Sequence, residues 1–177
     1  MNRLLLALAL IALSATPVLA ALKPGAQAPP FTAQATLGGD VFTFDLAAAL
    51  AKGPVVLYFY PAAFTEGCTI EAHEFASHIA DYKRLGATVI GVSGDDLAKL
   101  QRFSISECRK KFAVASDPKL TIATSYDAKL GFGPVQYANR TSYVIAPDGT
   151  IVYAYTSLDP AKHVENTLAA LRKLAAR

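Results

Sequence analysis

Short apolar runs, separated by segments with helical periodicity, dominate the middle of the chain. Residues 54–60 (PVVLYFY) are apolar throughout and rich in β-branched and aromatic side chains, which predicts a strand covered on both faces. Residues 87–92 and 112–115 repeat this pattern over shorter stretches. Buried strands that alternate with helices pair in parallel, so this region predicts the centre of an α/β sheet.

Paired strands flank this centre on both sides. Residues 31–44 contain two strand-like runs around Gly38 and Gly39, and residues 141–155 contain two around a Pro-Asp-Gly turn at 147–149. Apolar runs joined by glycine-containing turns predict antiparallel hairpins.

The intervening segments predict helices. After a turn at 61–67, apolar positions alternate at spacings of four and three, which is one helical face ending near Gly86. The residues on this face are Cys68, Ala72, Phe75, Ile79 and Tyr82.

Polar residues mark the expected starts of the other helices. Asp45 precedes a short helix over residues 46–51, and Ser93 or Asp95 precedes one that carries Leu97, Leu100 and Phe103 inward. Asp117-Pro118 begins a helix of one or two turns, and residues 131–134 belong to a loop. The last helix begins at Asp159-Pro160, and its inner face is Val164, Leu168, Leu171 and Ala175.

This element order predicts an α/β protein with a mixed β-sheet, helices on both faces and an N-terminal hairpin. A single cysteine, Cys68, lies at the turn between the central strand and its helix. That position indicates a thioredoxin-like fold.

Length and charge narrow the functional classes. The chain has 177 residues, which is one domain, and 53% of them are apolar, which excludes intrinsic disorder. The formal net charge of +3 is small and dispersed, so we expect no nucleic-acid partner.

The first twenty residues have the pattern of an export signal. Arg3 precedes an apolar run over residues 4–13, and small residues lead to a cleavage site before Ala21. We therefore expect a signal peptide at 1–20, a mature domain at 21–177 and a periplasmic or secreted protein without membrane attachment after cleavage. An uncleaved anchor is the alternative.

Cys68 is the main candidate for chemistry. Unsatisfied amide groups and the helix dipole converge on the first turn of a helix and favour a thiolate there. Glu71 lies one turn further on, where its charge alone would oppose the thiolate, so a cation is needed between them. Arg140, at the head of a buried strand, is the best candidate. An inert core thiol is the alternative from position alone.

Histidine does not complete a catalytic triad in this pattern. His73 and His78 follow Cys68 on the same predicted helix without facing it, and His163 lies in the last helix. We expect all three to be solvated or satisfied by ordinary hydrogen bonds.

Residues 58–75 (YFYPAAFTEGCTIEAHEF) closely resemble the peroxiredoxin signature Pro-x-x-x-Thr-x-x-Cys, with Pro61, Thr65 and Cys68 at the signature positions. The flanking residues are most similar to the peroxiredoxin Q branch, also called bacterioferritin comigratory protein. The resemblance covers the chain from Gly25 onward. It continues in residues 89–96 (VIGVSGDD), 115–118 (ASDP) and 140–151 (RTSYVIAPDGTI).

The resemblance implies a thiol-dependent peroxidase that needs no metal or other cofactor. Cys68 would attack hydrogen peroxide or a small organic hydroperoxide and become a sulfenic acid. Thr65 would hydrogen-bond the peroxide, and Arg140 would stabilise the thiolate and the developing charge. Pro61 would shield the sulfenate, and Glu71 would orient Arg140.

The chain departs from many members of this branch at one place. A second cysteine often lies five residues after the first, where this chain has His73. The resolving thiol is then Cys108 or an external thiol, and a structural role for Cys108 stays open. Residues 109–111 (RKK) would favour a Cys108 thiolate.

The resemblance also implies partners, and two other functions remain as alternatives. We expect a thioredoxin-like or other thiol reductant and a monomer or homodimer. A thiol-disulfide oxidoreductase is disfavoured because the chain lacks Cys-x-x-Cys. A metal-binding module such as a copper carrier is disfavoured because such a site requires closely spaced cysteines. Here residue 72, one helical turn after Cys68, is Ala.

Overall fold

The computed structural model describes residues 21–176, and the predicted signal peptide lies outside the described residues. The strands are β1 Thr32–Leu37, β2 Asp40–Asp45, β3 Val55–Phe59, β4 Thr88–Ser93, β5 Ala113–Ser116, β6 Lys129–Phe132, β7 Val135–Ala138, β8 Thr141–Ile145 and β9 Ile151–Thr156. The helices are α1 Leu46–Leu50, α2 Glu66–Ser77, α3 Ile79–Arg84, α4 Leu97–Ser106, α5 Thr121–Ser125 and α6 Ala161–Ala175.

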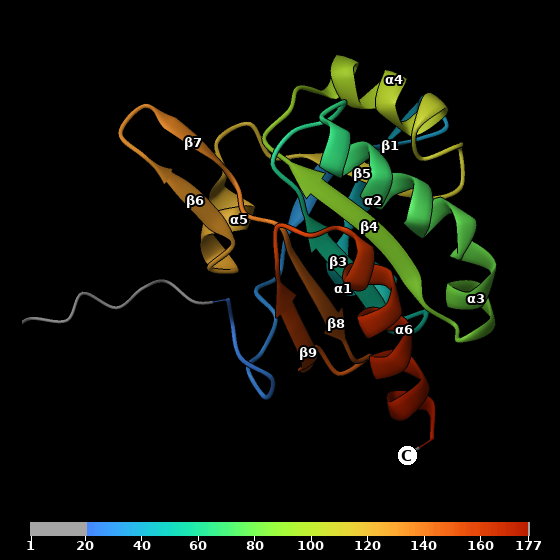
Figure 1. The fold of residues 1–177 in the computed structure, drawn as a ribbon. Coiled ribbons are helices and arrows are strands. Elements are labelled where there is room, and N and C mark those ends of the chain that lie inside the picture. Colours follow the sequence, from blue (N-terminus) through green and yellow to red (C-terminus); the bar gives the residue numbers. More distant parts are fainter. Residues whose placement is uncertain (1–20, 177) are drawn as a thin grey trace, which may run out of the picture.

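A seven-stranded mixed sheet organises the domain in the order β2-β1-β5-β4-β3-β8-β9 (Figure 1). Strands β3, β4 and β5 run parallel to one another, and β8 is antiparallel to β3. The predicted hairpins are both present, as the pairs β1–β2 and β8–β9. All five residues of β3 are buried, because this strand has a neighbour on each side and a helical layer on each face.

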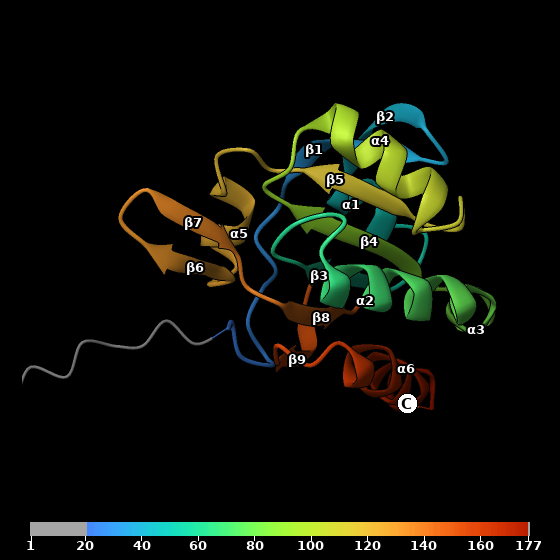
Figure 2. The same ribbon diagram turned by 45° about the horizontal axis from the view of Figure 1, so that its top comes forward.

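Helices cover both faces of the sheet, which confirms the predicted fold class (Figure 2). The short helices α1 and α5 pack on one face, around core residues that include Leu57 and Tyr143. The longer helices α2, α4 and α6 pack on the other face, around Tyr58, Phe75 and Leu168. Alternate residues of β3 serve the two cores, as the period of a strand requires.

The long helix expected after the central strand is interrupted. Helix α2 ends at Ser77, and α3 begins at Ile79 after His78 leaves helical geometry with φ −103° and ψ 9°. The predicted apolar face is nevertheless buried across the interruption, from Cys68 to Tyr82. Because the periodicity continues through the break, the pattern could not reveal it.

Two predicted helix starts were wrong. Asp96, rather than Ser93 or Asp95, caps α4 by accepting from the Lys99 amide at 2.8 Å. Helix α5 begins after Asp117-Pro118 rather than at it. The Asp117 carboxylate reaches forward to accept from the amides of Thr121 and Ala123, each at 2.9 Å.

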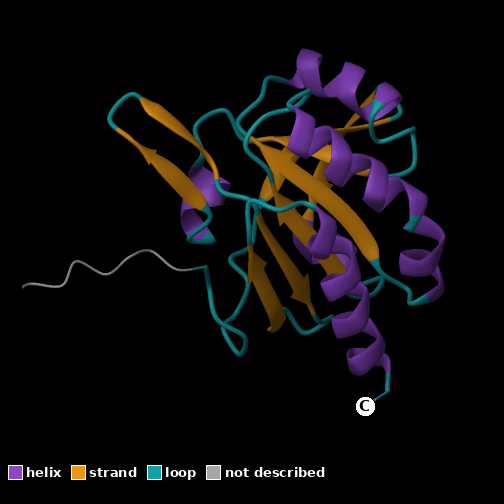
Figure 3. Cartoon of the chain, viewed as in Figure 1, coloured by secondary structure: helices purple, strands orange, loops and turns teal. Residues whose placement is uncertain are grey.

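Smaller deviations occur toward the C-terminus. The loop expected at residues 131–134 lies in a separate hairpin, β6–β7, which projects from the domain (Figure 3). Residues 131–132 end β6, and residues 133–134 form the turn. Pro160 is the N-cap of α6, one residue after the predicted cap, and Ala175 is exposed rather than buried. No helix among residues 21–176 has both the length and the apolar character needed to cross a bilayer.

Candidate active site

The chain enters α2 through a tight turn that exposes the start of the helix. Phe64 has a left-handed backbone with φ 67°, and Thr65 is the N-cap of α2. The Thr65 hydroxyl donates to the Ala62 carbonyl at 2.9 Å and makes no side-chain cap to the helix. The first amide groups of α2 therefore remain without a side-chain partner and face the region of Cys68.

Asp95 holds this turn against the end of β4. Its carboxylate accepts from the Ala63 amide at 2.7 Å and from the Ser93 hydroxyl at 2.8 Å, and it pairs with Lys99 at 2.6 Å. The sequence pattern marked Asp95 only as a possible helix cap. Its role in the turn depends on a contact across 32 positions of sequence, which no local pattern reveals.

Arg140 lies between the sulfur of Cys68 and the carboxylate of Glu71. Its Nη2 donates to Cys68 Sγ at 3.4 Å, and its Nη1 donates to Glu71 Oε2 and to the Gly67 carbonyl, the latter at 3.4 Å. Cys68 is 2% exposed, Glu71 0% and Arg140 5%. The predicted cation between the thiol and the carboxylate is therefore present.

Sheet topology explains how Arg140 reaches Cys68 from 72 positions away. Arg140 directly precedes β8, whose first residue, Thr141, pairs with Phe59 at the end of β3. Cys68 follows the same end of β3. Antiparallel pairing of β8 with β3 thus brings the guanidinium to the N-terminus of α2.

Gly67 provides the space that this arrangement requires. A Cβ atom at position 67 would lie 3.0 Å from Arg140 Nη2. The absence of a side chain lets the guanidinium pack against the backbone of the first helical turn. Arg140 thus occupies part of the space that a side chain at position 67 would fill.

Burial controls the protonation of the Glu71 carboxylate. It raises the pKa of Glu71 to about 8, although the charge and hydrogen bond of Arg140 act in the opposite direction. Burial also opposes the charge of Arg140, but the neighbouring Glu71 and Cys68 raise the pKa of the guanidinium overall. Arg140 is therefore the permanent charge of the site, and Glu71 is a group that can hold a proton.

Aromatic side chains surround the base of α2. Tyr58 stacks on Phe75 with ring centroids 4.4 Å apart and on Tyr60 at 5.4 Å. Phe64, which is 44% exposed, packs edge-on against Phe103. Pro61 and Thr65 lie in the turn beside these rings, partly buried and exposed respectively. The sulfur thus faces a largely apolar environment with one fixed cation.

Cys108 is buried two residues beyond the end of α4. It belongs to the same core as Cys68, and both thiols are free. Burial raises the pKa of the Cys108 thiol, and the adjacent Glu107 carboxylate raises it further. The expectation that residues 109–111 favour a Cys108 thiolate was therefore wrong, because the sulfur points into the core rather than toward these cations.

Contacts from α2 hold the Cys108 segment in place. His73 Nε2 lies 2.8 Å from Glu107 Oε2, and Arg109 Nη1 donates to the Ser77 hydroxyl at 3.4 Å. Arg109 has a left-handed backbone, with φ 51°. His73 thus contacts the neighbour of Cys108, a contact that helical spacing could not predict.

His163 is the histidine that the sequence interpretation underrated. His73 and His78 are 37% and 43% exposed, as expected for solvated side chains. His163 is fully buried and lies 3.6 Å from Glu71 Oε1. It does have ordinary hydrogen-bond partners, but one of its neighbours belongs to the candidate active site.

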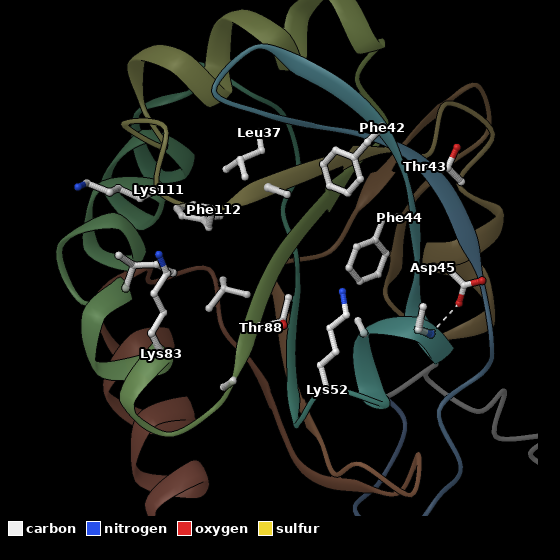
Figure 4. Close-up of a pocket in the computed structure, with 16 residues that line it drawn as sticks. Leu37, Phe42, Thr43, Phe44, Asp45, Lys52, Lys83, Thr88, Lys111 and Phe112 are labelled. Atoms are coloured by element: carbon white, nitrogen blue, oxygen red, sulfur yellow. Dashed lines mark hydrogen bonds between the residues drawn. The ribbon is translucent and has the colours of Figure 1, made fainter.

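A separate hollow in the described domain lies away from this site (Figure 4). It has a volume of about 490 Å³ and is lined by residues such as Phe44, Lys52 and Phe112. It adjoins Thr88 and Ala113, the first residues of the parallel strands β4 and β5. Cys68 follows the last residue of β3, which is parallel to them, so the hollow lies at the opposite end of the sheet.

Residues 21–176 contain no cluster of three or more histidine, cysteine, aspartate or glutamate side chains arranged to hold a metal ion. The polar groups at Cys68 are one guanidinium and one carboxylate that are already paired with each other. What this arrangement can supply is a buried sulfur nucleophile with a fixed positive charge beside it.

Comparison with known proteins places this chain in a family. Residues 24–154 match the AhpC/TSA family. The chain is 35% identical over 147 residues to a putative peroxiredoxin of Mycobacterium tuberculosis, covering 81% of this chain and 90% of that protein. It is 37% identical over 123 residues to the chloroplastic peroxiredoxin Q of Triticum aestivum, covering 68% of this chain and 55% of the wheat protein. The chain thus spans about half the length of the wheat relative.

Solved structures agree with this placement. The peroxidoxin BcpB of Mycobacterium tuberculosis superposes with a TM-score of 0.80 at 30% identity, over 86% of this chain and 98% of that one. Peroxiredoxin Q of Xanthomonas campestris superposes with a TM-score of 0.71 at 27% identity, over 80% and 90% of the two chains. The chain belongs to the AhpC/TSA family and, within it, to the peroxiredoxins.

The protonation of Glu71 makes stability depend on pH. Its pKa rises from 4.5 to about 8 on folding, so the folded protein binds this proton more tightly than the unfolded chain. The resulting stabilisation is complete below pH 4.5 and is lost as the pH rises toward 8. Glu71→Gln cannot lose the proton. The free energy of unfolding of the wild type, relative to this variant, should fall across that range and then level off.

Urea denaturation at a series of pH values measures this difference. Glu74→Gln is the matched control, because Glu74 lies on the same helix with its side chain 47% exposed. We expect no comparable trend in the control. A difference between wild type and Glu71→Gln that stays constant from pH 4.5 to 8 would show that the folded protein does not retain this proton.

Proposed function

We propose that this peroxiredoxin is a thiol-dependent peroxidase that reduces hydrogen peroxide or small organic hydroperoxides. The observation that carries the proposal is the Arg140 guanidinium, which donates to Cys68 Sγ in a buried site. A positive charge held beside a sulfur stabilises the thiolate, and the thiolate is the nucleophilic form. The family of the chain supports the same reaction.

The proposed reaction is a two-electron transfer from sulfur to oxygen. The Cys68 thiolate attacks one peroxide oxygen, and the O–O bond breaks as the S–O bond forms. The departing hydroxide or alkoxide takes a proton and leaves as water or alcohol. Cys68 is oxidised to a sulfenic acid, and the peroxide is reduced.

Arg140 is positioned to stabilise the charge that moves during this step. In the reactant the negative charge is on sulfur, and in the transition state it spreads onto the departing oxygen. A guanidinium has several donors in one plane, so it can bond sulfur and oxygen together. Glu71 and the Gly67 carbonyl hold the other edge of the group and fix its orientation.

The turn before α2 supplies the remaining proposed roles. Thr65 donates its own hydroxyl hydrogen to the Ala62 carbonyl, which leaves the hydroxyl oxygen free to accept from a peroxide O–H. Thr65 is exposed, so a substrate can reach it from solvent. Pro61 lies in the same turn, where its ring restricts access of water to the oxidised sulfur.

We assign the resolving step to Cys108 or to an external thiol. A Cys68–Cys108 disulfide would form when the Cys108 thiolate attacks the sulfenic sulfur and expels hydroxide, which takes a proton and leaves as water. Both sulfurs start buried, and Glu107 and Arg109 tie the Cys108 segment to α2. This route therefore requires local unwinding after α4. A thioredoxin-like reductant would then return the disulfide to two thiols.

Substitution of Cys68 tests the proposed activity. Cys68→Ser should abolish peroxide consumption with a thiol reductant, because a serine hydroxyl is not a nucleophile of comparable strength at neutral pH. Cys108→Ser is the matched control, since it removes the other buried thiol and leaves the first oxidation step intact. Peroxide consumption by Cys68→Ser at the wild-type rate would refute the proposal.

The mass of the intact chain identifies the resolving thiol. Reduced protein is treated with one equivalent of hydrogen peroxide and no reductant. Loss of two hydrogens would assign resolution to Cys108, and this product should be absent from the Cys108→Ser variant. Gain of oxygen on Cys68 with Cys108 still reduced would assign resolution to an external thiol. An unchanged mass would contradict a peroxidatic Cys68.

A further inference from the structure

His163 lies behind the active site, in the first turn of α6. Its Nε2 lies 3.0 Å from the Ser157 carbonyl, and its Nδ1 lies 2.8 Å from the Ser142 hydroxyl. Ser142 is in β8, two residues after Arg140. All of His163, Ser142 and Glu71 are 0% exposed. Three elements therefore converge on one buried imidazole: α6, β8 and α2.

The hydrogen bonds fix which nitrogen carries hydrogen. A carbonyl oxygen can only accept, so Nε2 must be protonated to bond Ser157. In a neutral imidazole Nδ1 is then an acceptor, and the Ser142 hydroxyl donates to it. Burial lowers the pKa of His163 to about 4, which favours this neutral form.

Nδ1 also has Glu71 as a close neighbour. Glu71 Oε2 is bonded by Arg140, whereas Oε1 has no hydrogen-bond partner among the described residues. Oε1 lies 3.6 Å from His163 Nδ1. Nδ1 already accepts from the Ser142 hydroxyl, and 3.6 Å is longer than a hydrogen bond, so this contact is electrostatic. A negatively charged Oε1 close to the lone pair of Nδ1 in a buried site is unfavourable, which favours a proton on Oε1. The raised pKa of Glu71, about 8, is consistent with a proton held there.

We propose that His163 is a positioning residue for the peroxidase reaction: the lone pair of its Nδ1 favours a proton on the nearby Glu71 Oε1 and thereby leaves the charge of Arg140 available to Cys68. The proposal rests on the function assigned to Cys68 above. While Glu71 carries this proton, the Glu71–His163 pair is neutral and Arg140 acts on the sulfur at nearly full strength. When it is lost, the Glu71 carboxylate offsets the guanidinium.

The surroundings of His163 contain few other charges. Glu71 faces it from α2, Arg140 from the start of β8 and Asp159 from the segment before α6. The Tyr155 ring packs edge-on against the imidazole from β9, with centroids 4.8 Å apart. Arg140 opposes and Asp159 favours a charged imidazole, so these two influences act in opposite directions. Glu71 is the neighbour that can exchange a proton with Nδ1.

This arrangement predicts an alkaline decline in the reactivity of Cys68. The rate constant with hydrogen peroxide should fall as Glu71 loses its proton, because the positive field at sulfur then weakens. His163→Asn retains a polar side chain but provides a weaker acceptor for the proton. We expect the decline to move down by at least about one pH unit, which is about tenfold in proton affinity.

Ser142→Ala is the second variant, and it removes only one oxygen atom. Nδ1 then has Glu71 as its remaining proton donor, so the decline should move to higher pH. This opposite shift is a result that general destabilisation would not produce. The Ser142→Ala variant also tests the proposal if His163→Asn does not fold.

The measurements use the full mature chain with Cys108→Ser, so that a single thiol reacts. Oxidation by hydrogen peroxide and alkylation by iodoacetamide are each followed by intact mass from pH 5 to 10. Thr167→Val is the control, because Thr167 is buried on the same helix but bonds Tyr82 instead of Glu71. We expect it to lower stability without moving the decline.

Each outcome decides one of the two proposals. Opposite shifts in His163→Asn and Ser142→Ala, with none in Thr167→Val, would support the role of His163 in keeping the proton on Glu71. No shift in either folded variant, or an equal shift in Thr167→Val, would overturn it. Alkylation reports on Cys68 whether or not peroxide reacts. Absence of reaction with peroxide while alkylation proceeds would therefore refute the peroxidase function separately.

Discussion

The site depends on one buried cation that contacts a sulfur and a carboxylate at once. Arg140 is nearly inaccessible to solvent, and water cannot screen its charge there. Burial of a guanidinium is unfavourable unless its donors are paired. Glu71, Cys68 and the Gly67 carbonyl provide that pairing, and they also restrict the orientation of the group. Removing any one of them changes the charge balance of the others.

The fold brings these groups together through strand pairing rather than through local sequence. Strand β3 leads into the start of α2, and the antiparallel strand β8 places Arg140 at the same end of the sheet. Helix α6 packs against α2 and brings His163 close to Glu71. Asp95 fixes the intervening turn from the end of β4. The active site is thus the meeting point of elements from most of the chain, supported by a sheet whose central strand is fully buried.

Much of the fold could be predicted because its signals are periodic. The buried strands, both main hairpins and the apolar face of α2 follow from alternation and spacing. The break at His78 could not be predicted, because the apolar face continues through it. The start of α4 was misplaced because Asp95 bonds the Ala63 amide instead of capping the helix. The start of α5 was misplaced because the Asp117 carboxylate reaches over three residues to the first amides of the helix.

The candidate site likewise has features that the sequence could predict and features that it could not. The need for a cation between Cys68 and Glu71 followed from charge alone, and Arg140 meets it. The contact between His163 and Glu71 joins positions 92 residues apart, and no spacing rule connects them. The buried state of Cys108 overrode the effect expected from its basic neighbours, because desolvation acts more strongly on a thiolate than charges that point into solvent.

The most direct test of the central claim is the rate constant for oxidation of Cys68 by hydrogen peroxide in Arg140→Lys and Arg140→Ala, both with Cys108→Ser. Lysine retains the charge but lacks the planar set of donors that reaches sulfur and carboxylate together. The account predicts a fall of about 10²–10³-fold in Arg140→Ala, the usual effect of losing one preorganised donor, with only partial recovery in Arg140→Lys. A rate constant within about threefold of the parent in Arg140→Ala, well below the loss expected for such a donor, would contradict the account.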